Sequence, residues 1–309
     1  MNNTRRLFNL YKESPLYQLF VSLMTIIGVG MTLSVILVLA GKLIFSSDLS
    51  VLDKASDALS KKDLGFMRYI LISQDISLLI IPSIIIMLLM RPESSGGLTE
   101  LKMPQLKEMG LVVILTFCIF PVTSFTGQIN SAMHFPGWLS GMEHWMIDKE
   151  DKADNLIEML VESNTFRVMM LNLLTIALLP AIAEELIFRG VFQKIFSNIF
   201  KSGHVAIWFT AFLFSTIHFQ FFGFIPRFIL GLVFGYLFFW SGTLWLPVIS
   251  HFVNNAFPVI LAYFQDMEKL NAPIDTPLWK QALYLPLPIV ISMVILFYFR
   301  NKNISRRLR

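Results

Sequence analysis

Long apolar runs constrain the fold of this chain more than any other feature of its sequence. The first runs from Leu16 to Phe45 and contains a single charged side chain, Lys42. A transmembrane helix needs about 20 mainly apolar residues, so this run is long enough to cross a bilayer. It is too long for the apolar region of a signal peptide and lacks a convincing cleavage site. We therefore expect it to be retained.

Seven further apolar segments follow the first. Of the 309 residues, 55% are hydrophobic and 15% are charged, whereas about a quarter are charged in soluble domains. This composition excludes a soluble enzyme, a disordered chain and a disulfide-stapled secreted domain, and the single cysteine, Cys118, cannot pair within the chain. The sequence predicts an all-α, polytopic membrane protein with about eight transmembrane helices. The expected spans are 16–45, 69–90, 109–125, 167–199, 205–222, 224–240, 244–264 and 283–299.

The positive charges of the chain predict its orientation. The formal net charge is +4, but no RNA- or DNA-binding motif accompanies it, so we expect no nucleic acid partner. Cytoplasmic loops of membrane proteins carry an excess of Lys and Arg. A dense basic cluster ends the chain at 300–309, and the expected span count is even. We therefore expect both termini in the cytoplasm. No organelle address is evident, which favours a bacterial cytoplasmic membrane with the lipid bilayer as partner.

The longest outer loop is expected at 126–166. It combines Trp138 and Trp145 with a group of acidic residues. Aromatic and charged residues on opposite faces are typical of a helix lying in the membrane interface. The alternative, which we favour from the sequence, is a solvated acidic loop.

A few ionisable and amide side chains interrupt the apolar spans. A charged group at bilayer depth costs several kcal/mol, so each such residue is a candidate for function. The ionisable residues are Asp75, Glu184, Glu185, Arg189, His218 and His251, with Asn254 and Asn255 as neutral companions.

Two adjacent carboxylates, Glu184 and Glu185, follow Pro180 in the fourth span. On a helix, Glu185 and Arg189 are four residues apart on one face, in the favourable order for an ion pair. Glu184 lies about 100° around the helix and remains free to act as a general base. Pro180 predicts a kink just before the carboxylates.

Histidines occur in two other spans of the C-terminal half. His218 lies in the fifth expected span and His251 in the seventh. His251 and Asn255 are four residues apart and share a helix face, whereas Asn254 is expected to point elsewhere. We expect Glu184, His218 and His251 at similar depth, around one hydrated cavity.

A carboxylate, two imidazoles and an amide can activate water and stabilise an oxyanion, as peptide-bond hydrolysis requires. The same side chains could bind zinc through Glu184, His218 and His251, with water as the fourth ligand. The residue types alone leave both mechanisms open. A proton-coupled transporter is disfavoured because the polar residues cluster in one half, without a matching half-site.

These residues resemble the CAAX protease and bacteriocin-processing (CPBP, or Abi) family of intramembrane endopeptidases, which includes the type II CAAX prenyl endopeptidase. The resemblance covers about 180–258. It rests on Glu-Glu-x-x-x-Arg, Phe-x-x-x-His and His-x-x-x-Asn motifs in this order, with a Gly-rich block before the last. The motif residues are Glu184, Glu185 and Arg189, then Phe214 and His218, then His251 and Asn255, with Gly231 and Gly235 in the Gly-rich block.

The resemblance implies a role for each motif residue. Glu184 and His218 would activate the attacking water, and His251 and Asn255 would form the oxyanion hole. Glu185 and Arg189 would support them. We favour a mechanism without a cofactor, with zinc as the alternative, and expect a peptide or membrane-protein substrate. A non-catalytic immunity or scaffold protein on the same fold is the competing hypothesis.

The resemblance also suggests how the chain is organised. We expect N-terminal transmembrane helices and loops over 1–166 and a protease core over 167–309, together forming one integral membrane domain. Gly231 and Gly235 form a small-x-x-x-small pattern that we expect to pack neighbouring spans within the chain.

Overall fold

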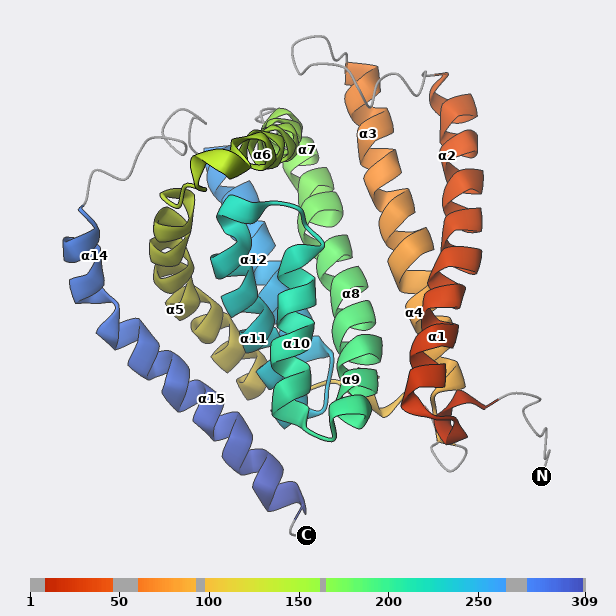
Figure 1. The fold of residues 1–309 in the computed structure, drawn as a ribbon, viewed down its shortest axis with the longest axis vertical. Coiled ribbons are helices and arrows are strands. Elements are labelled where there is room, and N and C mark those ends of the chain that lie inside the picture. The colour runs from red at the N-terminus through yellow and green to blue at the C-terminus, as the bar shows by residue number, and fades with distance from the viewer. Residues whose placement is uncertain (1–8, 47–60, 93–97, 162–164, 265–276, 308–309) are drawn as a thin grey trace.

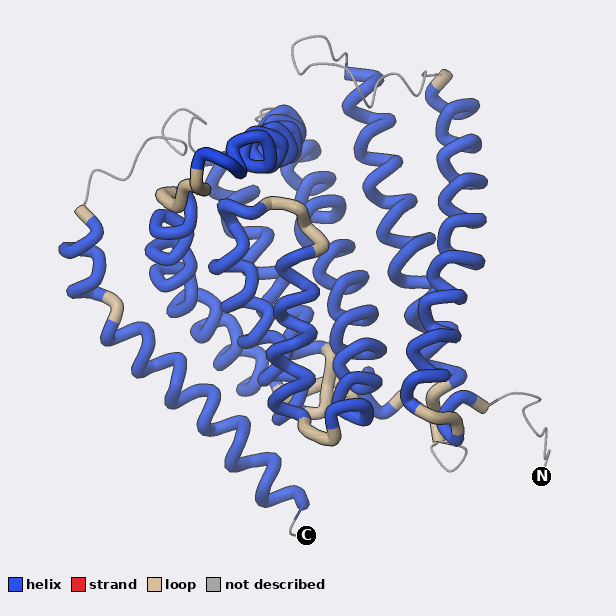
Figure 2. The backbone as a smooth tube through the Cα atoms, viewed as in Figure 1, coloured by secondary structure: helices blue, strands red, loops and turns tan. Residues whose placement is uncertain are grey.

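The computed structural model is a helical bundle, described for residues 9–46, 61–92, 98–161, 165–264 and 277–307. No strand occurs in these ranges, and the loops lie mostly at the two ends of the bundle (Figure 2). Helices satisfy their own backbone hydrogen bonds, which a bilayer requires. The predicted all-α membrane fold is confirmed.

The number of spans differs from the prediction. Within the described residues, six helices are long and apolar enough to cross a membrane, or seven if one bent pair is a single span. The fifth expected span corresponds to α10 (Gly203–Thr216), which has only 14 residues. Its length is about 21 Å at 1.5 Å per residue, against a hydrocarbon core of about 30 Å. The count of eight is therefore not confirmed.

The helices form a central group flanked on both sides (Figure 1). On one flank, the continuous helix of α1, η2 and α2 packs beside α3, η5 and α4. On the other flank, α15 lies along α5 and α11. The bounds are Pro15–Thr25 (α1), Ile26–Gly30 (η2), Met31–Phe45 (α2), Lys61–Gln74 (α3), Asp75–Ile80 (η5), Ile81–Leu89 (α4), Leu106–Ser131 (α5), Phe224–Ser241 (α11), Trp245–Phe264 (α12), Leu278–Tyr284 (α14) and Pro286–Arg307 (α15).

The segment expected as a solvated acidic loop contains a helix. Residues Ser140–Val161 form α6, which lies across one end of the bundle (Figure 1). Its inward side buries Met146 and Leu160, whereas Trp138, just before the helix, is 81% exposed. The prediction of a solvated loop was therefore wrong for residues 140–161. Apolar residues are spaced among the acidic ones, and they give the helix a face that packs on the bundle.

The fourth span is one long helix of changing pitch. It consists of α7 (Phe166–Asn172), η8 (Leu173–Leu178), α8 (Leu179–Glu185), η9 (Leu186–Phe192) and α9 (Gln193–Phe200). The widened π-helical segment η8 ends two residues before Pro180, and η5 likewise ends two residues before Pro82. A proline ring crowds the carbonyl four residues earlier, and a wider turn relieves this contact.

Close packing of α10 against α11 depends on glycine. A Cβ atom on Gly231 would stand 3.0 Å from the Cα and Cβ of Ala211, and one on Gly235 would stand 2.8 Å from Ile207. The small-residue pattern thus packs two helices within the chain, as expected. This approach fixes the position of α10, whose end leads into His218.

Candidate active site

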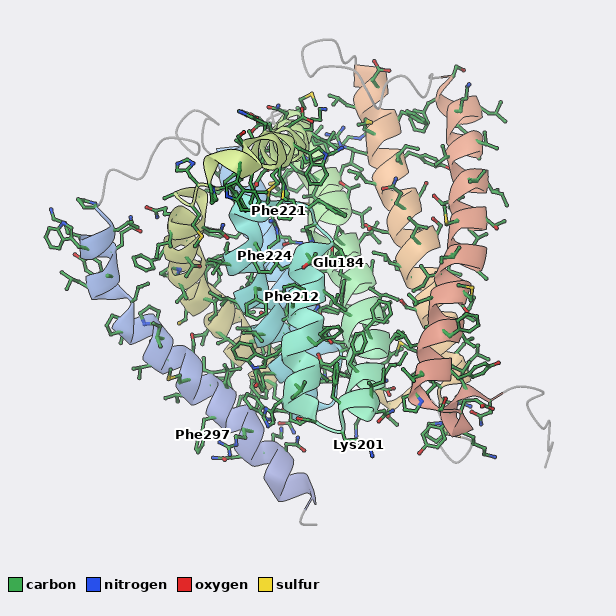
Figure 3. The ribbon with its side chains drawn as sticks, in the orientation of Figure 1. Glu184, Lys201, Phe212, Phe221, Phe224 and Phe297 are labelled. Atoms are coloured by element: carbon green, nitrogen blue, oxygen red, sulfur yellow. The ribbon has the colours of Figure 1, made fainter. Side chains whose placement is uncertain are left out.

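The four residues with predicted catalytic roles line one cavity of about 690 Å³. Glu184 comes from α8, His218 follows α10, and His251 and Asn255 come from α12. Figure 3 shows Glu184 within the bundle, next to α10. The structure therefore brings together side chains that are up to 71 positions apart in the sequence (255 minus 184).

The carboxylate of Glu184 faces both histidines. Its Oε2 atom lies 3.8 Å from Nε2 of His218 and 3.8 Å from Nε2 of His251, too far for direct hydrogen bonds. This Oε2 atom is buried and has no hydrogen-bond partner among the described residues. A buried acceptor without a partner requires an explanation, and capacity for water or substrate supplies one.

Hydrogen bonds on the opposite side of each ring determine how the histidines face Glu184. His218 Nδ1 lies 2.6 Å from the Phe214 carbonyl, and His251 Nδ1 lies 3.0 Å from Glu185 Oε1. Carbonyl and carboxylate oxygens only accept, so Nδ1 donates in both rings. In the neutral form, each Nε2 is then an acceptor directed at Glu184.

Glu185 and Arg189 form the buried ion pair that their spacing predicts. Arg189 Nη1 donates to Glu185 Oε1 over 2.9 Å, and both side chains are 0% exposed. Arg189 Nη2 also donates to the Gly231 carbonyl over 3.0 Å, which links α11 to the pair. Because Glu185 Oε1 also accepts from His251, one carboxylate orients a histidine and an arginine.

Aromatic rings surround these buried groups. The Arg189 guanidinium lies 4.9 Å from the Phe214 ring and 5.4 Å from the Phe234 ring. Phe234 also stacks on His251, with 4.9 Å between the centroids and 20° between the planes. The sequence did not predict a role for Phe234, because an aromatic residue within an apolar span carries no distinguishing signal.

The amide pair on α12 differs from the prediction in one respect. Asn254 lines the cavity as well as Asn255, and its Nδ2 donates to Asn255 Oδ1 over 3.1 Å. The prediction that Asn254 points elsewhere was wrong, because a cavity of this width admits two adjacent helix positions. With its oxygen accepting from Asn254, Asn255 retains an amide nitrogen that can donate to a ligand.

Arg227 is a charged cavity residue that was not predicted from the sequence. It donates from Nη1 to the Gln220 carbonyl over 2.9 Å and from Nη2 to the Gln220 side chain. Its position in the apolar run 224–240 was a usable signal, since ionisable residues in spans are rare. Asp75, in contrast, was singled out but does not line the cavity; it lies on η5, which packs against α8.

The three side chains considered as zinc ligands meet only part of the requirement. A carboxylate and two imidazoles are suitable ligand types, and each histidine has the Nδ1 partner common in metal sites. However, no group of three His, Cys, Asp or Glu side chains in the described part of the chain is arranged to hold a metal ion. Zinc therefore stays the alternative to the cofactor-free mechanism.

Comparison with known proteins supports the resemblance over the same part of the chain. Residues 166–257 match the family model described as type II CAAX prenyl endopeptidase Rce1-like. A curated relative, the uncharacterized protein YpbD of Bacillus subtilis (strain 168), is 29% identical over 89 residues. This match covers 28% of the chain and 42% of the relative's length. No solved structure matches.

The matched segment contains the buried pair of Glu185 and Arg189. It also contains Glu184 and the other predicted catalytic residues of the cavity, which are His218, His251 and Asn255. Residues 166–257 are thus similar to the Rce1-like family, within a helical membrane protein.

Proposed function

We propose that this protein is an intramembrane endopeptidase that hydrolyses a peptide bond with water activated by Glu184 and His218. One observation carries the proposal: the buried, unpartnered Oε2 of Glu184 lies 3.8 Å from two imidazole nitrogens in a cavity within the bundle. The Rce1-like match over the same residues supports this class of reaction.

Water activation follows from the acceptors around the cavity. A water molecule would donate one hydrogen bond to Glu184 Oε2 and the other to His218 Nε2. As its oxygen attacks the peptide carbonyl carbon, the proton passes to Glu184 and later to the departing amine nitrogen. General-base catalysis of this kind contributes about 10² to 10⁴ in rate.

The negative oxygen formed by this attack needs donors. The Asn255 amide nitrogen is one. His251 becomes a second donor when its Nε2 is also protonated, and Glu185 behind Nδ1 stabilises that charged ring. Glu185 would thus act as the buried aspartate of a Ser-His-Asp triad does behind its histidine. Each such donor contributes about 10² to 10³ in turnover.

The size of the cavity supports a substrate that enters as an extended peptide segment or as the end of a membrane protein. Its volume of about 690 Å³ holds only a few residues. The bilayer and a peptide or membrane-protein substrate are the partners that we propose, at the cell membrane.

Glu184→Gln tests the proposal directly. The purified protein would be assayed with fluorescence-quenched peptides, with and without a prenylated cysteine near the C-terminus. Gln keeps the size of the side chain but cannot take the proton, so cleavage should fall by at least about 10²-fold. Asn255→Ala should reduce turnover by a similar factor. Asp148→Asn, in an exposed pair with Lys152, is the control.

The same assay decides between the proposal and its competitors. A non-catalytic immunity or scaffold protein would show no cleavage that depends on Glu184. A zinc enzyme would lose activity to a strong chelator and regain it only with added zinc, because metal binding depends on these ligands. Full activity with no detectable metal would support the cofactor-free mechanism.

A further inference from the structure

His218 lies in the connection between α10 and α11, which we call the His218 loop (residues 217–223). Most of this loop is not α-helical, and it places Phe219 at a φ of +52°. A left-handed conformation is unfavourable for a bulky residue, so the surrounding structure must impose it. Unlike Glu184 and His251, which lie on long helices, His218 depends on what holds this loop.

Helix α6 contacts the His218 loop through both polar and aromatic groups. Glu150 Oε2 accepts a hydrogen bond from the Phe222 backbone N–H over 3.0 Å. The Trp145 ring lies edge-on to Phe219, at 6.4 Å between centroids, and 6.1 Å from the Phe221 ring. In Figure 3, Phe221 lies at the end of the bundle near α6. Gln220 Nε2 also donates to Asp154 Oδ1 over 3.3 Å. The four consecutive loop residues 219–222 thus each contact α6.

Helices α5 and α11 hold the other side of the loop. Asn130, on α5, donates to the Phe221 carbonyl over 3.0 Å and accepts from the Ile225 N–H over 2.7 Å. Arg227, on α11, donates to the Gln220 carbonyl over 2.9 Å. Helix α6 lies across the end of the bundle, where it contacts the same loop (Figure 1).

The contacts from α6 and α5 originate outside the segment that matches the Rce1-like family, whereas Arg227 lies inside it. The match covers residues 166–257, whereas α6 spans Ser140–Val161 and α5 spans Leu106–Ser131. The matched segment therefore contains His218 but does not contain everything that positions it.

We propose that α6 is a clamp that positions His218, with Glu150 and Trp145 as positioning residues that act through the His218 loop. The inference rests on the proposed function for its effect on cleavage. It does not require Glu150 to contact the substrate.

Glu150→Ala would remove the acceptor of the Phe222 N–H, and Glu150→Gln would keep a side-chain carbonyl in its place. For Glu150→Ala we expect kcat to fall about tenfold to a hundredfold, because a misplacement of about 1 Å costs about 10²-fold. KM should change less than about twofold. Glu150→Gln should restore most of kcat, and Asp148→Ala, on the exposed side of the same helix, should leave it unchanged.

Combining Glu150→Ala with His218→Ala tests whether one residue acts through the other. If Glu150 only positions His218, its loss should change the residual activity of His218→Ala less than about twofold. A full tenfold loss in that background would overturn the inference.

Amide hydrogen exchange separates this inference from the proposed function, because it needs no substrate. In Glu150→Ala, residues 217–223 should exchange at least about tenfold faster than in wild type, since a hydrogen bond to a charged acceptor is lost. Unchanged exchange together with unchanged kcat would overturn the clamp. Faster exchange with cleavage indifferent to His218→Ala would retain the clamp and refute the catalytic role of His218.

Discussion

At the scale of single residues, Arg189 is the centre of the buried polar cluster. Its guanidinium joins Glu185 on its own helix to the Gly231 carbonyl on α11, between the rings of Phe214 and Phe234. A charge with no solvent exposure is tolerated only with such partners. Arg189 therefore stabilises the arrangement of three helices around the cavity.

Arg189→Ala should lower the free energy of unfolding by about 3–5 kcal/mol, because it leaves the buried Glu185 carboxylate without its cation. Arg189→Lys keeps the charge but cannot reach two acceptors with one planar group, so its loss should be smaller. Thermal unfolding in detergent measures both. An unchanged melting temperature for Arg189→Ala would contradict the burial of this pair.

The residue-level predictions succeeded where helix geometry determines the outcome. The spacing of Glu185 and Arg189 predicts their contact, and the structure confirms it at 2.9 Å. The convergence of Glu184 with the two histidines was also predicted and is found. The catalytic roles stay predictions. Spacing could not reveal Phe234 or the position of Asn254, which depend on the width of the cavity and on packing between helices.

At the scale of elements, the close approach of α10 and α11 sets the position of His218. Gly231 faces Ala211, and Gly235 faces Ile207, with no space for a side chain. The rigid backbone of α10 leaves little room to adjust at Ala211.

Gly231→Ala should destabilise the protein by about 1–3 kcal/mol, the usual cost of overpacking, because its new Cβ meets the backbone of α10. Gly110→Ala is the matched control: Gly110 also lies in a helix, but nothing lies within 4 Å of its Cβ position. Helix propensity alone favours alanine there by up to about 1 kcal/mol. Equal melting temperatures for the two variants would contradict tight packing at Gly231.

The docking of α6 should depend on pH. Burial raises the pKa of the Glu150 carboxyl; the Phe222 N–H and Arg227 oppose this shift, while Asp154 and Asp151 add to it. The folded state therefore holds the proton more tightly than the unfolded state, and stability decreases as pH rises through the raised pKa.

Glu150→Gln removes this titration. We expect its melting temperature to exceed that of wild type at about pH 8, where wild-type Glu150 is charged. The difference should disappear near pH 4, below the ordinary glutamate pKa of about 4.3. A difference of the same size at both pH values would show that Glu150 ionisation does not affect docking.

The sequence predicted the long helices better than the short ones. Continuous apolar runs locate the helix of α1, η2 and α2, the helix from α7 to α9, and α12 within about one residue at each end, because their length and composition agree. The acidic residues of α6 concealed an amphipathic helix, and the end of α10 could not be read from hydropathy. The apolar run continues past Thr216 into the His218 loop, which is shaped by contacts with α5 and α6.

At the scale of the whole molecule, contacts cross the expected division at 166/167. The α3–α4 helix packs against α8 and η9, and Lys194 on α9 pairs with Glu100 before α5. Lys302 on α15 reaches back to Glu108 on α5 over 2.6 Å. The two-part organisation stays a prediction, as does the cytoplasmic location of both termini. In Figure 1, α1 begins and α15 ends at the same end of the bundle.

The short length of α10 has a consequence for the membrane itself. Its outer face exposes Trp208 and Phe212, so lipid would contact a helix about 9 Å shorter than the hydrocarbon core. Such hydrophobic mismatch is relieved when the bilayer thins around the helix. Headgroups and water would then approach the end of α10, where His218 lies. A bilayer with shorter acyl chains is already thin, so it should need less distortion to match α10. Membrane thickness would thus affect how readily water reaches the buried carboxylate of Glu184.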